Sequence, residues 1–373
     1  MGPIPFLPLR EINLPYENTI SEALARVRES GIYLLGDELH AFETEWATYC
    51  GTRFAIGVGS GLDALWIVLE AWKELGYLKL GDEVLVPAQT YFACFLAVQR
   101  AGLVPIPVDI QLPTAQIDLA DAERALSART KAIMAVHLYG LVAPMREIRE
   151  FASAKGLLVL EDGAQAHGAR DASGACVGAM GDAAAFSFYP TKVLGCMGDG
   201  GAITTDDQDF ADLVRKIRNY GTSSKYHHEV TGFNSRLDEF QAAILRTKLA
   251  AIEHTLERHR AVAGHYLEAL SQRELTLPAP RPGELPAWHL FVVTVPSRER
   301  FRERLVSEFQ IETMVHYPIL PSDQPACLPA RSRATPTAER HSQECVSLPC
   351  HAMLLDSQVS QVIQAVQNLI PPK

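Results

Sequence analysis

From Phe54 onward, short apolar runs alternate along the chain with longer segments in which apolar residues recur every three or four positions. The short runs predict buried strands, and the longer repeats predict helices that lay one apolar face on a sheet. Regular alternation of the two predicts an α/β fold, with a mostly parallel sheet covered on both faces. The predicted strands are 54–58, 83–86, 104–108, 132–137, 157–160, 183–188 and 202–205, and the predicted helices are 62–76, 92–101, 144–155 and 207–219.

The helix predicted to begin at Leu62 shows the pattern clearly. A glycine-rich segment, residues 57–61, precedes it. The free backbone N–H groups and the dipole of a helix that starts in this way favour an anion. Such turns are also common as purely structural features, so the sequence leaves both interpretations open. The apolar stripe of this helix consists of Leu62, Leu65, Trp66, Leu69 and Trp72.

Two regions flank the alternating body. The first 50 residues combine a proline-rich start with two amphipathic runs, and they predict an arm and helices that lie across the body. A long helix is predicted from Leu237 to Leu270, and the proline-rich segment 277–283 then leads into a small α+β domain. The predicted divisions are therefore 1–50, 51–250 and 251–373. The small domain is expected to contain strand 289–295, helix 298–309, strand 311–317 and helix 357–369.

Composition narrows the class of protein. The chain has 373 residues, of which 47% are hydrophobic and 21% charged, and its net charge is −10. A field of that sign argues against nucleic acid or an anionic membrane as partner. The sequence shows neither a secretory signal nor a span of roughly 18 uncharged apolar residues, so we expect a cytoplasmic protein. Seven scattered cysteines without Cys-x-x-Cys spacing predict buried thiols and no metal site.

Lys192 is the candidate for the chemistry. It lies between the predicted strands 183–188 and 202–205, with Pro190 before it and four glycines after it. An amine held in a tight apolar loop loses hydration, so its pKa falls and it can attack a carbonyl. A solvated surface lysine is the alternative, and three further sites decide between the two.

Those three sites lie at the carboxyl ends of predicted strands, where ligands of α/β sheets collect. Together they meet the needs of pyridoxal phosphate. Gly61, Leu62 and Ser187 are placed to bind a phosphate, and Tyr91 offers a ring for stacking. Asp162 can keep the pyridine nitrogen protonated, Gln165 can bond the ring hydroxyl, and Lys192 can form the Schiff base. An Asp at a strand end is also a common helix cap.

The motifs Glu161-Asp-Gly-Ala-Gln-Ala-His-Gly168, Ser187-Phe-Tyr-Pro-Thr-Lys192 and Asn234-Ser-Arg-Leu-Asp-Glu239 resemble those of the DegT/DnrJ/EryC1/StrS family of sugar aminotransferases. The resemblance implies the aspartate aminotransferase (type I) fold and a homodimer whose sites are completed by the neighbouring subunit. It implies that Lys192 is the Schiff-base lysine, Asp162 the pyridinium partner, Gln165 the ring-hydroxyl contact, Tyr91 the stacking ring and Ser187 a phosphate ligand. Asn234 and Arg236 are then expected to reach the partner's phosphate or substrate.

The same resemblance suggests the reaction and its substrate. L-glutamate is the usual donor of the family, and Lys192 would move the proton in both halves of the transamination. The region around 225–236 resembles members that aminate C3 of nucleotide-linked keto-deoxysugars, with C4 amination as the alternative. His227, His228, His316 and Tyr317 are the expected substrate contacts, although the two loop histidines could be solvated. Many members carry Thr where this chain has Leu62, and dehydratases of the family replace the lysine with histidine.

Two rival functions differ in class. Gly59-x-Gly61-x-x-Ala64 satisfies a relaxed dinucleotide pattern, which suggests a nicotinamide-dependent oxidoreductase. Oxidoreductases of that kind carry an acidic residue at the end of the next strand, but this chain has Val86 and Pro87 there. A non-catalytic regulatory protein on the same fold is the second rival, and its expected mark is loss of Lys192.

Overall fold

The computed structural model describes residues 2–327 and 333–373. Within these residues the largest sheet has seven strands in the order β1-β9-β8-β7-β6-β2-β3. Only β9 runs antiparallel to its neighbours, so the prediction of a mostly parallel sheet is confirmed. The strands are β1 Phe54–Val58, β2 Glu83–Pro87, β3 Val104–Val108, β6 Thr130–Val136, β7 Leu158–Asp162, β8 Ala183–Ser187 and β9 Gly201–Thr205.

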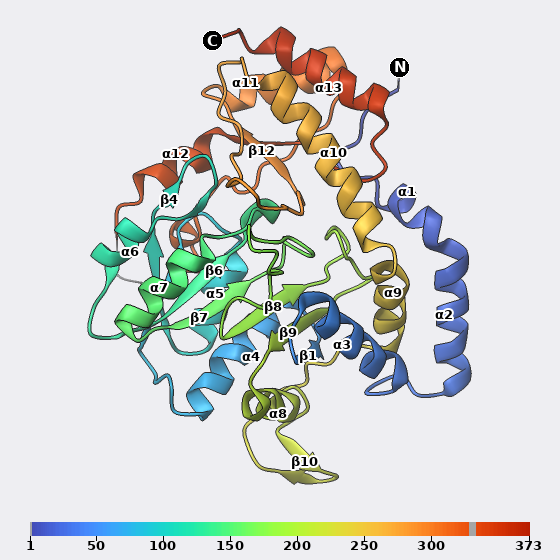
Figure 1. Cartoon of the computed structure of the whole chain (residues 1–373), viewed down its shortest axis with the longest axis vertical. Helices are drawn as coiled ribbons and strands as arrows, with labels where there is room; N and C mark the ends of the chain where they lie inside the picture. Colours follow the sequence, from blue (N-terminus) through green and yellow to red (C-terminus); the bar gives the residue numbers. More distant parts are fainter. Residues whose placement is uncertain (1, 328–332) are drawn as a thin grey trace.

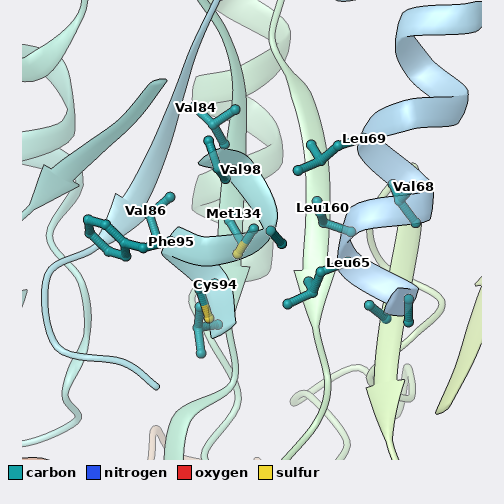
Figure 2. Close-up of a cluster of buried hydrophobic side chains, with 14 of the residues drawn as sticks. Leu65, Val68, Leu69, Val84, Val86, Cys94, Phe95, Val98, Met134 and Leu160 are labelled. Carbon is teal, nitrogen blue, oxygen red and sulfur yellow. The ribbon is translucent and has the colours of Figure 1, made fainter. Parts of the chain in front are cut away.

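Helices cover both faces of this sheet (Figure 1). Apolar residues of α4, α5 and α8 join strand residues such as Val86 and Leu160 in one core cluster. Residues of α3, α6 and α7 join Leu85 and Val159 in the other, because successive strand residues point to opposite faces. Figure 2 shows the first cluster, with Val84, Val86, Met134 and Leu160 against α4 and α5. These helices are α3 Asp37–Cys50, α4 Gly61–Glu74, α5 Phe92–Arg100, α6 Leu119–Ala125, α7 Met145–Lys155 and α8 Gln208–Ile217.

The register of the sheet brings the carboxyl ends of its parallel strands to one edge. Val136 of β6 lies opposite Asp162 of β7, and Asp162 lies opposite Ala185 of β8. Residues that follow these strands are therefore neighbours in space although they are far apart in sequence.

The predicted long helix from Leu237 to Leu270 is wrong, because the structure contains two helices, α9 Glu239–Leu249 and α10 Ile252–Leu270. Ala251 lies between them with non-helical dihedral angles, φ −114° and ψ 9°. The two helices have different packing partners, α2 Glu17–Ser30 and α3 for α9, and α13 Asp356–Leu369 for α10. A single straight helix cannot follow both surfaces.

The C-terminal elements form a third hydrophobic cluster with α10. Its strands β12 and β13 pair antiparallel, and the sequence had indicated only the first. The predicted strand 311–317 is wrong, since Ile311 pairs only with Ile4 of the N-terminal arm and Met314 only with Ser347 of β13. Changing partners after so few residues prevents a continuous ladder. The elements are β12 Phe291–Thr294, α11 Arg298–Phe309, η3 Pro321–Asp323, α12 Pro336–Glu344 and β13 Cys345–Leu348.

Short elements complete the described residues. A hairpin of β10 Thr222–Ser224 and β11 His227–His228 projects beyond α8 at the bottom of Figure 1. Among the described residues, no helix has the length and apolar character needed to cross a membrane. The remaining elements are α1 Leu9–Asn13, η1 Leu14–Tyr16, β4 Ile110–Gln111, β5 Gln116–Ile117 and η2 Leu138–Gly140.

Candidate active site

A cavity of about 870 Å³ lies at the carboxyl edge of the sheet. The segments that follow β1, β2, β6, β7 and β8 form one side of it, and the N-terminal arm and the C-terminal region form the other. Most of the residues predicted as site residues line it. Those that do are Gly61, Leu62, Tyr91, Asp162, Gln165, Ser187, Lys192, His316 and Tyr317.

Lys192 lies in the loop between β8 and β9. The loop is tight, because the N–H of Lys192 donates to the carbonyl of Tyr189 at 2.9 Å and the N–H of Cys196 donates to Phe188 at 2.7 Å. Burial lowers the pKa of Lys192 to about 8, although the negative charge of Asp162 offsets part of that effect. Within the described residues, Nζ of Lys192 donates no hydrogen bond. The amine is therefore unpaired among the described residues, and a much larger fraction of it is neutral near pH 7.5 than for an ordinary lysine.

Two side chains of α9 hold this loop in place. Nζ of Lys248 donates to the carbonyl of Gly195 at 2.6 Å, and Oε1 of Gln241 accepts from the N–H of Met197 at 2.9 Å. Burial also lowers the pKa of Lys248 to about 8. Unlike the amine of Lys192, the amine of Lys248 is already bonded and does not line the cavity.

The last two residues of β7 are both carboxylates, and strand alternation gives them different surroundings. Asp162 lines the cavity, whereas Glu161 is fully buried behind it. Glu161 accepts hydrogen bonds from the N–H groups of Gly178, Met180 and Gly181. It also bonds Nε2 of His137 at 3.0 Å. Glu161 is thus occupied with structural contacts, and Asp162 is the carboxylate that can meet a ligand.

Gln165 and two tyrosines form the wall beside Asp162. Oε1 of Gln165 accepts from the N–H of Tyr139 at 2.6 Å, and its Nε2 donates to the hydroxyl of Tyr317 at 3.0 Å. The ring of Tyr91 lies 5.4 Å from the ring of Tyr317, and 59% of Tyr91 is exposed. Tyr91 therefore offers a free aromatic face at the mouth of the cavity.

The opposite end of the cavity is built around the start of α4. The hydroxyl of Ser60 caps this helix by accepting from the N–H of Asp63 at 3.1 Å. The N–H groups of Gly61 and Leu62, in the first turn, have no acceptor within the helix. A Cβ at Gly61 would lie 2.4 Å from Cβ of Ser187, so only glycine fits there. The arrangement presents bare N–H groups and a hydroxyl, which suits a phosphate.

His316 and His289 approach from the C-terminal region. Nδ1 of His316 lies 2.7 Å from Oγ of Ser347, and burial together with the positive charge of Lys192 lowers its pKa to about 4. Burial and Lys192 also hold the pKa of His289 well below its usual value. Both rings are therefore neutral at physiological pH and can accept as well as donate hydrogen bonds.

Four predicted site residues lie outside the cavity of the single chain. His227 and His228 are exposed on the projecting hairpin, where they bond Ser223 and the carbonyl of Tyr220. Asn234 is exposed, and the guanidinium of Arg236 donates to Oδ1 of Asn219 at 2.9 Å. None of the four lines the cavity together with Lys192.

Several lining residues were not predicted as site residues. Thr90 bounds the cavity at the end of β2, His289 lies before β12, and Phe6 belongs to the arm. Cys94 does not line the cavity, but it contacts Asp162: its thiol donates a hydrogen bond to Oδ2 at 3.0 Å. Thr90 and Cys94 flank Tyr91 in the sequence, and that proximity was the available signal. Nothing in the sequence indicates that the arm and His289 reach this edge.

These residues fit pyridoxal phosphate. The free amine of Lys192, the buried carboxylate of Asp162 and the glycine cradle at Gly61 match the aldehyde, the ring nitrogen and the phosphate of that cofactor. Within the described residues, no cluster of His, Cys, Asp or Glu could hold a metal ion. The fold and the site define an aminotransferase of the type I pyridoxal phosphate class.

The chain belongs to the DegT/DnrJ/EryC1/StrS aminotransferase family, whose model matches residues 16–367. It is 45% identical to a dTDP-3-amino-3,6-dideoxy-alpha-D-galactopyranose transaminase of Aneurinibacillus thermoaerophilus, over 98% of this chain and 99% of that one. It is 43% identical to a dTDP-3-amino-3,4,6-trideoxy-alpha-D-glucose transaminase of Streptomyces venezuelae, over 98% and 96% of the two chains.

Solved structures agree with this assignment. The crystal structure of S. venezuelae DesV in complex with a ketimine intermediate superposes with a TM-score of 0.94 at 43% identity and covers 99% of each chain. The crystal structure of NtdA from Bacillus subtilis with bound cofactor PMP gives a TM-score of 0.92 at 30% identity, over 99% of this chain and 85% of that one. The predicted fold, cofactor and enzyme class are thus confirmed.

Proposed function

We propose that the enzyme transfers the amino group of L-glutamate to the C3 keto group of a nucleotide-linked deoxysugar, giving an amino sugar and 2-oxoglutarate. The observation that carries the transfer is the free amine of Lys192 on the same cavity as Asp162. Support for the substrate comes from relatives at 45% and 43% identity that are named as dTDP-3-amino-sugar transaminases.

We assign each residue a role. Lys192 would hold the cofactor covalently, and its released amine would take the proton from the α-carbon of the donor and, in the second half of the reaction, give a proton to the sugar carbon that becomes aminated. Asp162 would stabilise a positive charge at the ring nitrogen, and the ring of Tyr91 would stack on the cofactor. The N–H groups of Gly61 and Leu62 and the hydroxyl of Ser187 bind the phosphate. When bound, pyridoxal phosphate supplies an electron sink for the carbanion formed at that carbon.

Gln165, His316 and Tyr317 complete the wall toward the substrates. Gln165 has a second amide hydrogen beyond the one given to Tyr317, and this hydrogen is available to the ring hydroxyl. His316 and Tyr317 would contact the sugar. The cavity of about 870 Å³ falls near the top of the ~300–1,000 Å³ range of ligand sites, so it can hold a sugar nucleotide beside the cofactor.

A second copy of the chain would complete the site. Tyr91, Tyr189, Met197 and Tyr220 are large side chains exposed by between 47% and 59% in the single chain, and they support a buried homodimer face. Asn234, Arg236, His227 and His228 would then serve the cavity of the other copy. We also retain the division into 1–50, 51–250 and 251–373, and a cytoplasmic location, as proposals.

The test is a substrate panel. Purified enzyme loaded with cofactor is given L-glutamate and nucleotide-linked 3-keto or 4-keto deoxysugars, and release of 2-oxoglutarate is measured. We expect release with a 3-keto sugar and none from Lys192→Ala. A preference for the 4-keto sugars would favour amination at C4. Failure to release 2-oxoglutarate with any of the sugars would contradict the proposal. Two relatives are named as regulatory or sensory proteins, so the panel also separates catalysis from regulation.

A further inference from the structure

Cys94 is a buried thiol to which the proposed mechanism gives no role. It lies in the first turn of α5 and is 1% exposed. Figure 2 shows it at the lower edge of the apolar cluster that α5 makes with the sheet. On one side it has apolar neighbours, and on the other it reaches the carboxylate of Asp162.

The donor and the acceptor in each hydrogen bond of Cys94 can be assigned. Burial and the negative charge of Asp162 raise the pKa of the thiol well above its usual value, so it keeps its proton. Sγ lies 3.0 Å from Oδ2 of Asp162, and a carboxylate oxygen only accepts, so the thiol donates. Oγ1 of Thr90 lies 3.0 Å from the same sulfur. Because the one hydrogen of the thiol is donated to Asp162, the hydroxyl of Thr90 must donate to the sulfur.

This chain of donors acts on a carboxylate that is only 7% exposed. Asp162 receives one donor on each oxygen, the N–H of Ala164 on Oδ1 at 3.0 Å and the thiol of Cys94 on Oδ2. The two bonds fix the rotation of the carboxylate about its side-chain bond.

We propose that Cys94, held by Thr90, is a positioning residue that keeps the Asp162 carboxylate aimed at the ring nitrogen of bound pyridoxal phosphate. The proposal rests on the role proposed above for Asp162. The other groups that face Asp162 are the amine of Lys192, from the loop after β8, and the hydroxyl of Tyr317, from the segment after α11. Neither is altered in the variants of Cys94 and Thr90.

The test uses the intact enzyme loaded with cofactor and records the cofactor absorbance as a function of pH. A protonated ring nitrogen lowers the pH midpoint of that absorbance change, because its positive charge disfavours a second proton nearby. In Cys94→Ala the carboxylate loses the contact that fixes its rotation, so it turns away from the ring nitrogen more often and holds the ring proton less well. We expect its midpoint to rise by about 0.5 to 1 unit, and the dissociation constant of the cofactor to rise by about 3- to 10-fold.

Three further variants make the result specific. Cys94→Ser keeps a donor, so its midpoint should stay within about 0.2 units of the parent. Thr90→Val removes the donor to the thiol and should shift the midpoint upward by less than Cys94→Ala, which also tests the proposal if Cys94→Ala does not fold. Cys50→Ala, at the end of α3, removes another buried thiol, one that bonds Cys176 and not Asp162, and should leave the midpoint unchanged.

Asp162→Asn separates the two possible failures. It should shift the midpoint further than any variant of Cys94. If Asp162→Asn shifts the midpoint but Cys94→Ala and Thr90→Val do not, the inference about Cys94 is overturned and the role of Asp162 stands. If Asp162→Asn leaves the midpoint in place, the proposed role of Asp162 fails, and the inference fails with it.

Discussion

The lowered pKa of Lys192 predicts how fast the protein without cofactor captures pyridoxal phosphate at each pH. Only the neutral amine attacks the aldehyde. With a pKa of about 8, roughly a quarter of the amines are neutral at pH 7.5, whereas roughly one in a thousand would be neutral for an ordinary lysine. The structure therefore predicts capture at pH 7.5 that is on the order of 200-fold faster than for a solvated lysine.

The assay follows the absorbance change on mixing cofactor-free protein with pyridoxal phosphate between pH 6 and 10, and it confirms the site by borohydride reduction and mass spectrometry. We expect the rate to rise with pH and to level off above about pH 8. In Asp162→Asn the half-maximal pH should fall, because the carboxylate raises the pKa of the amine. Lys192→Ala should trap nothing, although Lys248 has a similarly lowered pKa.

Two outcomes would refute the reasoning. A rate that keeps rising through pH 9 to 10 would mean that Lys192 is hydrated like a surface lysine. An upward move of the half-maximal pH in Asp162→Asn would mean that the carboxylate does not stabilise the charged amine.

Three other substitutions probe the supports of the site. Gly61→Ala places a Cβ 2.4 Å from Cβ of Ser187, so we expect a loss of about 1–3 kcal/mol in urea unfolding and weaker cofactor binding; an unchanged dissociation constant would contradict the close approach. Leu62→Thr adds a hydroxyl at the start of α4 and should tighten cofactor binding by about 0.5–1.5 kcal/mol in a fluorescence titration, whereas Leu62→Val, which adds none, should not. The folded-state pKa of Lys248, about 8, lies below its unfolded value, so the folded protein binds fewer protons between about pH 8 and 10.5 and the free energy of unfolding should rise with pH across that window. Lys248→Met should flatten that rise in urea unfolding at pH 7.5 and 10, and an undiminished slope would show that another group is responsible.

The alternating body of the fold could be predicted from sequence because its strands are buried on both faces. Such strands are continuous apolar runs, and their carboxyl ends lie at one edge whatever the details of packing. Asp162, Ser187 and Lys192 could therefore be assigned to a common site before any coordinates. The two predictions that were wrong, the long helix and the strand 311–317, concern features that depend on partners distant in the sequence. The break at Ala251 and the short pairings of Ile311 and Met314 arise where one segment must meet two different neighbours.

The contacts around the site residues could not be predicted from the sequence either, because they also join residues that are distant along the chain. Cys94 and Asp162 are 68 positions apart, and only the order of the strands makes them neighbours. Asp162 and Glu161 are adjacent and chemically alike, yet one meets the cavity and the other meets three backbone N–H groups. His227, His228, Asn234 and Arg236, two histidines and two polar residues near position 230, do not line the cavity of the single chain.

The N-terminal arm makes the cavity depend on residues that are synthesised much later than the arm itself. Phe6 and Cys350 line the same cavity, and Ile4 pairs with Ile311. At about 5–20 residues per second, roughly 20 to 70 s separate the emergence of Phe6 from that of Cys350. Once Lys192 has emerged, the nascent chain has the lysine and the phosphate cradle but lacks the wall that contains Cys350, so a cofactor bound at that stage would lie in a pocket open to water.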